Sequence, residues 1–266
     1  MHYPPLHDTS LDSLAGAALP DRSTMTVGSS RVAVVDYGAG NLRSAARALA
    51  RAGADVVVSD DPATIATADR IVLPGVGAFA QCIRQLRERT GIEAALDEAV
   101  NQRGTPFLGI CVGMQLLASV GHEHGVHQGL GWLPGIVTRL TPADPALKIP
   151  HMGWNRVTAA NASGVAEGHA YFVHSYRFDP EDPADVRATS DHGGAFPAIV
   201  ARGNITGVQF HPEKSQAYGL AFLKNWLTSP PPSQGGGRGE GLSVGEGRNA
   251  VNTLPPAPSL AGRGSL

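Results

Sequence analysis

Short apolar runs alternate with amphipathic stretches along the first half of this 266-residue chain. Apolar, β-branched runs are typical of buried parallel strands, and four of them occur, at 31–38, 54–60, 70–75 and 105–111. Between and after them, apolar residues recur at helical spacing, which predicts helices at 41–51, 78–89, 92–103 and 112–120. Strands that alternate with helices predict a parallel sheet with helices on both faces.

The second half of the chain carries shorter β-like runs, separated by proline, glycine, asparagine and aspartate. We expect strands at 135–140, 153–158, 170–178, 185–190, 196–201 and 205–210, and a closing helix at 220–227. These runs predict an antiparallel or mixed extension of the sheet. The expected fold class is therefore α/β, a doubly wound and mostly parallel sheet with helices on both faces.

The two ends of the chain differ from this body. Residues 1–29 hold one basic residue, Arg22, and no apolar segment like that of a signal peptide, so we expect a disordered extension and a translation start at Met25. Residues 229–266 hold nine glycines and six prolines but no aromatic residue, which is typical of a disordered tail. Its single GGGRGEG run favours a passive tail over an RNA-binding arm. The predicted domain is therefore 30–228.

Charge and cysteine content narrow the class of protein further. With 21 basic and 23 acidic residues the net charge is −2, so no basic field attracts nucleic acid. No apolar run reaches the roughly 18 residues that span a bilayer. Two cysteines do not form a disulfide framework in a chain of this length, which indicates a reducing compartment. We therefore expect a soluble α/β domain of the cytoplasm that binds neither nucleic acid nor membrane.

The clearest chemical signal lies at GICVGMQLL, residues 109–117. A buried strand runs into Gly-x-Cys-x-Gly and a helix follows at once, which is the pattern of a nucleophile elbow. The turn would present Cys111 at the carboxyl end of the sheet, where the helix N-terminus favours its thiolate. The backbone N–H of Val112 would then face a developing oxyanion. The alternative is a structural cysteine between two packing glycines.

A candidate base follows the last predicted strand, in FHPEKS at 210–215. Pro212 biases His211 toward an extended conformation, and positions two apart then project to the same side. Glu213 could thereby fix the tautomer of His211 that accepts a proton from a cysteine. A His-x-Glu pair alone usually indicates no more than surface polarity, so its value depends on the elbow at the neighbouring strand end.

Other motifs do not predict a cofactor or a metal. LPGVGAF at 73–79 matches a loose dinucleotide fingerprint but lacks the acidic residue that should follow about 20 positions later. Its two glycines instead allow the backbone around Val76 to turn an N–H toward an oxyanion. HEHGVH at 122–127 has the spacing of loop histidines rather than of metal ligands. Cys82, on the apolar face of a predicted helix, is expected in the core.

Six stretches together resemble a known family. GICVGMQLL and GVQFHPEKS, at 109–117 and 207–215, resemble the class I (triad) glutamine amidotransferases. Four more stretches narrow the resemblance to the glutaminase subunits of imidazole glycerol phosphate synthase: DYGAGNLRS at 36–44, LPGVGAF at 73–79, PHMGWN at 150–155 and YFVHSY at 171–176. The resemblance covers residues 31–227. It implies that glutamine is hydrolysed to glutamate, with no cofactor and no metal.

The resemblance also implies a partner. Ammonia would pass to a separate (β/α)₈-barrel cyclase subunit in a heterodimer. That subunit would make imidazole glycerol phosphate and the carboxamide ribonucleotide AICAR, in histidine biosynthesis. If the 75–77 strand must reorient to donate its N–H, the isolated subunit should be nearly inactive until the cyclase binds its ligand.

Individual residues acquire roles from the same resemblance. Cys111 would be the nucleophile, His211 the general base and acid, and Glu213 the carboxylate that orients it. The other implied positions are an oxyanion hole at Gly75, Val76, Gly77 and Val112, substrate contacts at Gln115, Ser175 and Tyr176, and a partner interface at Trp154, Tyr171 and Lys214. The family often has leucine where Val112 stands, but only the backbone of this residue is needed.

Three other functions compete with this interpretation. The glutaminase subunit of anthranilate or aminodeoxychorismate synthase resembles the chain at the elbow and at HPE, but PHMGWN and HPEKS favour the histidine pathway. A cysteine hydrolase on a similar sheet would need neither glutamine nor a partner. A catalytically silent scaffold would have no use for Cys111, His211 and Glu213.

Overall fold

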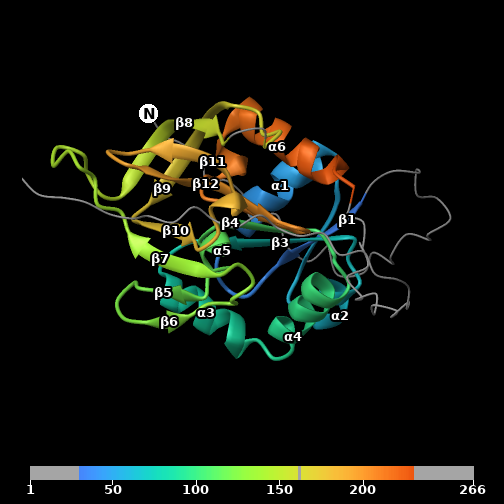
Figure 1. Cartoon of the computed structure of the whole chain (residues 1–266). Coiled ribbons are helices and arrows are strands. Elements are labelled where there is room, and N and C mark those ends of the chain that lie inside the picture. The colour runs from blue at the N-terminus through green and yellow to red at the C-terminus, as the bar shows by residue number, and fades with distance from the viewer. Residues whose placement is uncertain (1–29, 161–162, 231–266) are drawn as a thin grey trace, which may run out of the picture. The chain divides into compact units, whose positions relative to one another are not determined.

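The computed structural model describes residues 30–160 and 163–230, which belong to one compact unit (Figure 1). The expected extension at 1–29, the start at Met25 and the expected tail from 231 onward lie outside the described residues. Among the described helices, none is both long and apolar enough to cross a membrane.

A nine-stranded sheet forms the centre of this unit. Five neighbouring strands are parallel, in the order β2 (Asp55–Ser59), β1 (Arg31–Val35), β3 (Arg70–Gly75), β4 (Phe107–Cys111) and β13 (Ile205–Val208). Four antiparallel strands continue the sheet, in the order β12 (Ala195–Arg202), β11 (Val186–Asp191), β8 (His151–Ala159) and β9 (Gly168–His174). The expected parallel sheet and its antiparallel extension are both confirmed.

Helices cover both faces of the parallel half. Figure 1 shows α1 (Leu42–Ala52) and α6 (Gln216–Thr228) on one face. On the other face lie α2 (Pro62–Ala66), α3 (Phe79–Glu88) and α4 (Ile92–Asp97), which continues as the π-helix η2 (Glu98–Gln102). The expected doubly wound fold class is confirmed. The sequence pattern missed α2, although Asp61 supplies a recognisable N-cap by accepting from the N–H groups of Ala63 and Thr64.

The helix expected at 112–120 is wrong in length. Helix α5 ends after one turn (Val112–Gln115), and the chain then runs into a small hairpin of β5 (Val120–Gly121) and β6 (His127–Gln128). Carbonyls that would have continued the helix bond elsewhere, because Leu116 O accepts from Leu130 N and Leu117 O from Leu133 N. Tertiary hydrogen bonds to a returning segment therefore replace the helical ones.

The run expected as one strand at 170–178 is two strands in two sheets. β9 ends at His174, and β10 (Tyr176–Pro180) pairs with β7 (Gly135–Arg139) in a second sheet that also contains β5 and β6. Ser175 alone joins them. The closing helix α6 begins at Gln216, four residues before the expected start, because the 3₁₀ turn η4 (Pro212–Lys214) leads directly into it. A second such turn, η3, spans Pro183–Asp185.

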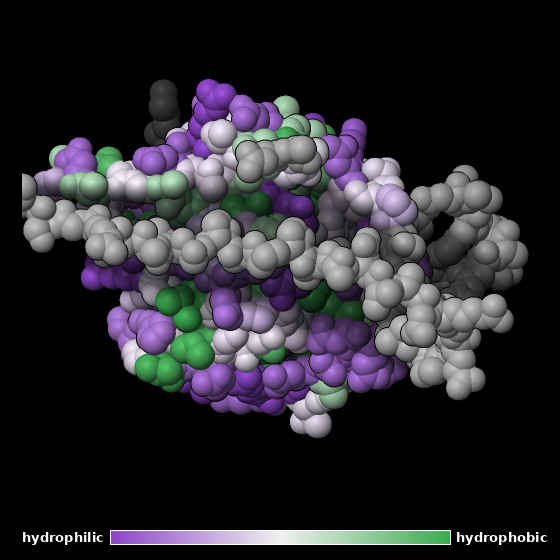
Figure 2. All heavy atoms as spheres, in the orientation of Figure 1, coloured by the Kyte–Doolittle hydropathy of each residue, from purple (hydrophilic) through white to green (hydrophobic). Residues whose placement is uncertain are grey.

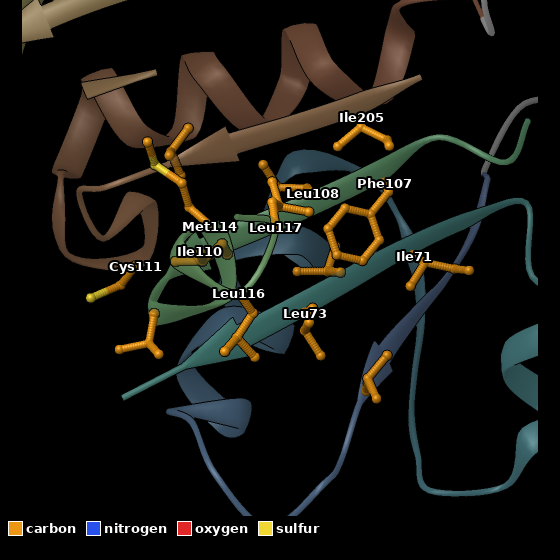
Figure 3. Packing of buried hydrophobic residues seen from close by; sticks show 14 of the residues in the cluster. Ile71, Leu73, Phe107, Leu108, Ile110, Cys111, Met114, Leu116, Leu117 and Ile205 are labelled. Carbon is orange, nitrogen blue, oxygen red and sulfur yellow. The ribbon is translucent and has the colours of Figure 1, made fainter. Parts of the chain in front are cut away.

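The core lies between the parallel strands and their helices. Figure 3 shows apolar side chains of β3, β4 and α5 packed together, while the sulfur of Cys111 points away from them at the end of β4. Cys82 is fully buried in the core, as expected. On the face seen in Figure 2, polar residues prevail, and apolar ones gather near β5 to β7. Two exposed apolar residues belong to this region: Val126, between β5 and β6, and Ile136, in β7.

Candidate active site

The end of strand β4 has the strained geometry of an elbow. Cys111 adopts φ 56° and ψ −111°, a backbone conformation that residues other than glycine rarely adopt. Helix α5 begins at the next residue. Two close approaches explain the flanking glycines. A Cβ on Gly113 would lie 1.9 Å from Leu73 O, and a Cβ on Gly109 would lie 2.5 Å from Gly113 O. The predicted turn is present, but Gly109 and Gly113 are required by these close approaches rather than by a positive φ.

His211 and Glu213 lie beside the elbow because β13 pairs with β4, with Val208 opposite Ile110. His211 is extended at φ −98° and ψ 100°, and its Nδ1 lies 2.8 Å from Glu213 Oε1. Both side chains are almost completely buried. Among the described residues, Nε2 of His211 finds no hydrogen-bond partner, which leaves it free at the pocket.

Three influences set the charge of the His211 ring. Burial disfavours the imidazolium, but the Cys111 thiolate and the Glu213 carboxylate favour it more strongly and raise the pKa of His211 to about 10. The ring is therefore protonated at neutral pH. An imidazolium beside a cysteine stabilises the thiolate and can later protonate a leaving group.

One pocket of about 260 Å³ brings together most of the residues that the sequence singled out. They come from four different strand ends, and they are Val76, Gly77, Cys111, Val112, Gln115, Ser175, Tyr176 and His211. Glu213 lies behind His211, and Gly75 pairs with Cys111 across β3 and β4. The carboxyl end of a doubly wound sheet thus holds a thiol, a base and backbone donors around a space that fits a small molecule.

Residues 33–229 match the family model described as Glutamine amidotransferase class-I. The chain belongs to the class I glutamine amidotransferases. The match covers all the strands of the sheet except the first residues of β1, and it contains the whole of the pocket.

Curated relatives place this glutamine amidotransferase more narrowly. It is 55% identical over 208 residues to the imidazole glycerol phosphate synthase subunit HisH of Zymomonas mobilis, which matches 76% of this chain and 98% of the relative. The subunit HisH of Rhodospirillum rubrum is 54% identical over 213 residues, 76% of this chain and 100% of the relative. The chain is therefore an amidotransferase of the HisH type, the glutaminase subunit of that synthase in histidine biosynthesis.

Solved structures share the fold at lower identity. A crystal structure described as a glutamine amidotransferase matches with a TM-score of 0.59 and 21% identity, over 73% of this chain and 97% of that one. The structure of PurLQS from Thermotoga maritima matches with a TM-score of 0.58 and 21% identity, over 75% and 98%. At this identity the likeness supports the amidotransferase fold alone.

Three polar residues at or directly behind this amidotransferase pocket were not singled out by the sequence analysis, and one of them, His174, lines the pocket. Gln209 is fully buried; its Nε2 donates to Cys111 Sγ over 3.8 Å, and its Oε1 accepts from Gln115 Nε2 at 3.0 Å. Gln209 lies two positions before His211, and residues two apart in an extended segment project to the same side. This spacing was a signal that Gln209 also belongs to the site. Glu123 lines the pocket and its Oε2 accepts from Phe79 N at 2.6 Å. It lies within HEHGVH, which attracted notice only as a histidine loop.

The histidines of that loop are at least partly exposed, as expected for a loop. Across residues 30–160 and 163–230, no group of three or more histidine, cysteine, aspartate or glutamate side chains is arranged to hold a metal ion.

The three residues expected at a partner interface lie on one surface of the amidotransferase. Trp154 packs edge-on against Tyr171 with ring centroids 6.2 Å apart, and Lys214 Nζ lies 5.7 Å from the Tyr171 ring centre. Trp154 is 48% exposed and its neighbour Met152 is 63% exposed. Large apolar side chains that remain in solvent beside a cation are typical of an interaction surface.

Proposed function

We propose that Cys111, His211 and Glu213 hydrolyse the side-chain amide of glutamine and that the ammonia is used by a cyclase subunit. The observation that carries this proposal is the pairing of a strained Cys111 with an imidazolium at the end of the neighbouring strand. A thiolate and an imidazolium in one small pocket are the two groups that acyl transfer from an amide requires.

The reaction follows in two steps. Cys111 Sγ attacks the amide carbon, and the tetrahedral intermediate breaks its C–N bond while His211 gives its Nε2 proton to the nitrogen, which leaves as ammonia. Water then attacks the resulting thioester. His211 accepts the proton of that water, glutamate departs, and the thiolate and the imidazolium are restored. Glu213, held at Nδ1, keeps Nε2 directed at the reacting atoms.

Backbone and side-chain donors bind the rest of the substrate. We assign the oxyanion hole to the N–H groups of Val112 and of the Gly75–Val76–Gly77 strand, where loss of one donor typically costs on the order of 10²–10³ in rate. Gln115, Ser175 and Tyr176 line the same pocket and would contact the glutamine.

An imidazole glycerol phosphate synthase subunit has a partner subunit, and we propose that it docks on the surface around Trp154, Tyr171 and Lys214. The partner would be a (β/α)₈-barrel cyclase that takes up the ammonia and makes imidazole glycerol phosphate and AICAR. We expect both reactions in the cytoplasm, where the free thiols of Cys82 and Cys111 stay reduced.

The test is ammonia release from glutamine by the full-length chain, alone, with the cyclase, and with the cyclase and its ligand. We expect little release alone and strong release with the liganded cyclase, and none from a Cys111→Ala variant under any condition. Cys82→Ser, which keeps a donor at that position, serves as a control for loss of a thiol as such. Glutaminase activity that ignores this cyclase would preserve the chemistry but assign it to another synthase. Activity that survives in Cys111→Ala would remove the mechanism.

A further inference from the structure

Two histidines that the proposed reaction does not use lie side by side at the pocket, and one of them, His174, lines it. His151 in β8 is opposite His174 at the end of β9, and both are buried. His151 Nδ1 lies 3.1 Å from His174 Nε2, and His174 Nδ1 lies 2.8 Å from Tyr176 O. At the outer end, Asn155 Nδ2 lies 3.2 Å from His151 Nε2.

The direction of these hydrogen bonds is fixed by their last acceptor. A carbonyl oxygen only accepts, so His174 must carry its proton on Nδ1, and Nε2 of the neutral ring is then an acceptor. His151 must therefore donate from Nδ1 and accept at Nε2. Asn155 supplies that donor, and its amide orientation is fixed independently, because Nδ2 also donates to Asp191 O and Oδ1 accepts from Arg156 N. Every member of the chain is satisfied only when both rings are neutral.

The inner end of the chain reaches the substrate side of the pocket. Tyr176 O also accepts from Gln115 Nε2 at 3.0 Å, and Gln115 in turn contacts Gln209, which donates to Cys111 Sγ. Asn155, His151, His174, Tyr176 and Gln115 thus form one continuous series of contacts that ends beside the nucleophile.

The outer end lies under the surface proposed for the partner. Residues alternate between the two faces of strand β8, so Met152 and Trp154 project into solvent while His151 and Asn155 project inward. Trp154 and His151 lie three positions apart in the same strand, so a contact at Trp154 acts on the strand that carries His151. Figure 1 shows β8 and β9 adjacent, with β10 close to the end of β9.

We propose that His151 and His174 are positioning residues, a relay of two neutral imidazoles through which the partner-facing strand β8 sets the Tyr176 carbonyl and the Gln115 amide. The effect of this relay on glutamine turnover rests on the proposed glutaminase function. The tautomer and the charge of the two imidazole rings do not depend on that function. Neither histidine touches the reacting atoms; both act through Tyr176 and Gln115.

The surroundings of the pair keep both rings neutral. Burial is the main cause that lowers the pKa of His151 to about 4 and that of His174 to about 3. His192, which stacks on His151 with ring centroids 4.3 Å apart, and the imidazolium of His211 act in the same direction. Phe172 and Phe196 supply the apolar contacts. A proton added to His174 Nε2 would place an N–H donor opposite the N–H donor at His151 Nδ1.

The first test is the tautomer of each ring in the full-length chain, read from nitrogen NMR of histidine-labelled protein at pH 7. We expect His151 and His174 to carry the proton on Nδ1 with Nε2 bare, and to remain so at pH 5.5. A proton on Nε2 of either ring, or an imidazolium at pH 7, would overturn the relay. This result does not depend on any enzymatic activity, so it tests the relay independently of the proposed function.

The second test measures glutamine turnover in the complex with the liganded cyclase. His151→Phe keeps a flat ring in the stack but removes the donor to His174, and we expect KM for glutamine to rise about three- to tenfold with a smaller change in kcat. His151→Asn keeps a donor near the position of Nδ1 and should restore most of the loss.

The outcomes separate the two proposals. A complex of the unaltered chain that releases no ammonia contradicts the proposed function, while the tautomers still report on the relay. An active complex in which His151→Phe keeps the normal KM contradicts the relay and leaves the function intact.

Discussion

At the scale of single residues, the elbow depends on the absence of a side chain at Gly113. The helix backbone crosses strand β3 so closely that a Cβ there would lie 1.9 Å from a carbonyl oxygen. Backbone on both sides of the contact belongs to the core, so neither can give way.

We therefore predict that Gly113→Ala lowers the free energy of unfolding by about 3 kcal/mol or more, or prevents folding. Gly203→Ala is the control: that residue has φ +57° but open space around it, so only the left-handed strain of about 1–2 kcal/mol applies. Urea unfolding measures both. Equal losses in the two variants would contradict the steric explanation.

A second residue-scale prediction concerns the charge of His211. A pKa raised from 6.5 to about 10 on folding stabilises the protein fully below pH 6.5, and this contribution is lost as the pH rises through 10. Glu213→Gln keeps an acceptor for Nδ1 but removes the negative charge, so we expect the pKa of His211 to fall. The variant should be less stable by about 1.5–3 kcal/mol at pH 6, and this deficit should shrink toward pH 10. Unfolding by urea at both pH values checks the sign, and a deficit that grows with pH is the contrary outcome.

Sequence reasoning worked at this scale where one residue type has one physical cause. The Gly-x-Cys-x-Gly pattern predicted a sharp turn from strand to helix, and Pro212 predicted the extended His211. It failed for Gln209, whose one signal was its spacing of two from His211, and for Glu123, because a loop glutamate carries no pattern of its own. Their roles depend on which strand ends the fold brings together.

At the scale of elements, helix α6 is attached to the sheet by one buried arginine. Arg70, the first residue of β3, donates from Nη1 to Trp226 O at 2.9 Å and from Nη2 to Ser229 O at 2.6 Å, and its guanidinium lies 5.3 Å from the Trp226 ring centre. A cation at the carbonyl end of a helix also complements its dipole.

Arg70→Met should therefore cost about 2–3 kcal/mol of stability, since a side chain of similar length keeps the packing but leaves two carbonyls without their donor. The exposed Arg43→Met should change the stability by less than about 0.5 kcal/mol. Thermal unfolding followed by circular dichroism compares them. Equal melting temperatures for both variants would show that α6 is held by apolar contacts alone.

A hydrogen bond from helix α3 also holds the loop after β3. Cys82 Sγ in α3 donates to Val76 O at 3.4 Å, and the hydroxyl of Tyr37, buried and without a partner among the described residues, lies close to Gly75. Burial is the main cause that raises the pKa of Cys82 to about 11, so the thiol keeps its proton and can donate.

If this contact holds the 75–77 strand in its resting orientation, Cys82→Ala should raise ammonia release in the absence of the cyclase by about three- to tenfold. Cys82→Ser retains a donor and should stay near the unaltered rate. The measurement is glutaminase activity of each isolated variant, with the stimulated rate as reference. An unchanged basal rate in Cys82→Ala would mean that the strand is not held here.

Elements with their own periodicity were predictable, and elements defined by their neighbours were not. The four parallel strands and α1, α3 and α6 follow from apolar spacing. The early end of α5 depends on residues 129–133, which take its carbonyls, and the division of 170–178 at Ser175 depends on two separate sheets. The local sequence of α5 does not show that residues 129–133 will take its carbonyls, and the local sequence of 170–178 does not show that two sheets will divide it.

At the scale of the whole molecule, the described residues complete their own packing by Ser229. Truncation after Pro230 should therefore shift the melting temperature by less than about 2 °C. Truncation after Asn225 removes Trp226 and both carbonyls that Arg70 binds, and should lower it by several degrees. Calorimetry of the two truncated chains tests this, and a large shift in the first one would show that residues beyond 230 stabilise the fold.

The two halves of the catalytic pair lie on adjacent strands but a hundred positions apart in the chain, Cys111 after β4 and His211 after β13. During synthesis at about 5–20 residues per second, the thiol emerges about 5–20 seconds before its base. Strand β13 must also enter between β4 and β12 before the two can meet. A nascent chain, or one that ends before residue 211, thus carries the nucleophile without its base, and we expect no ammonia release from it.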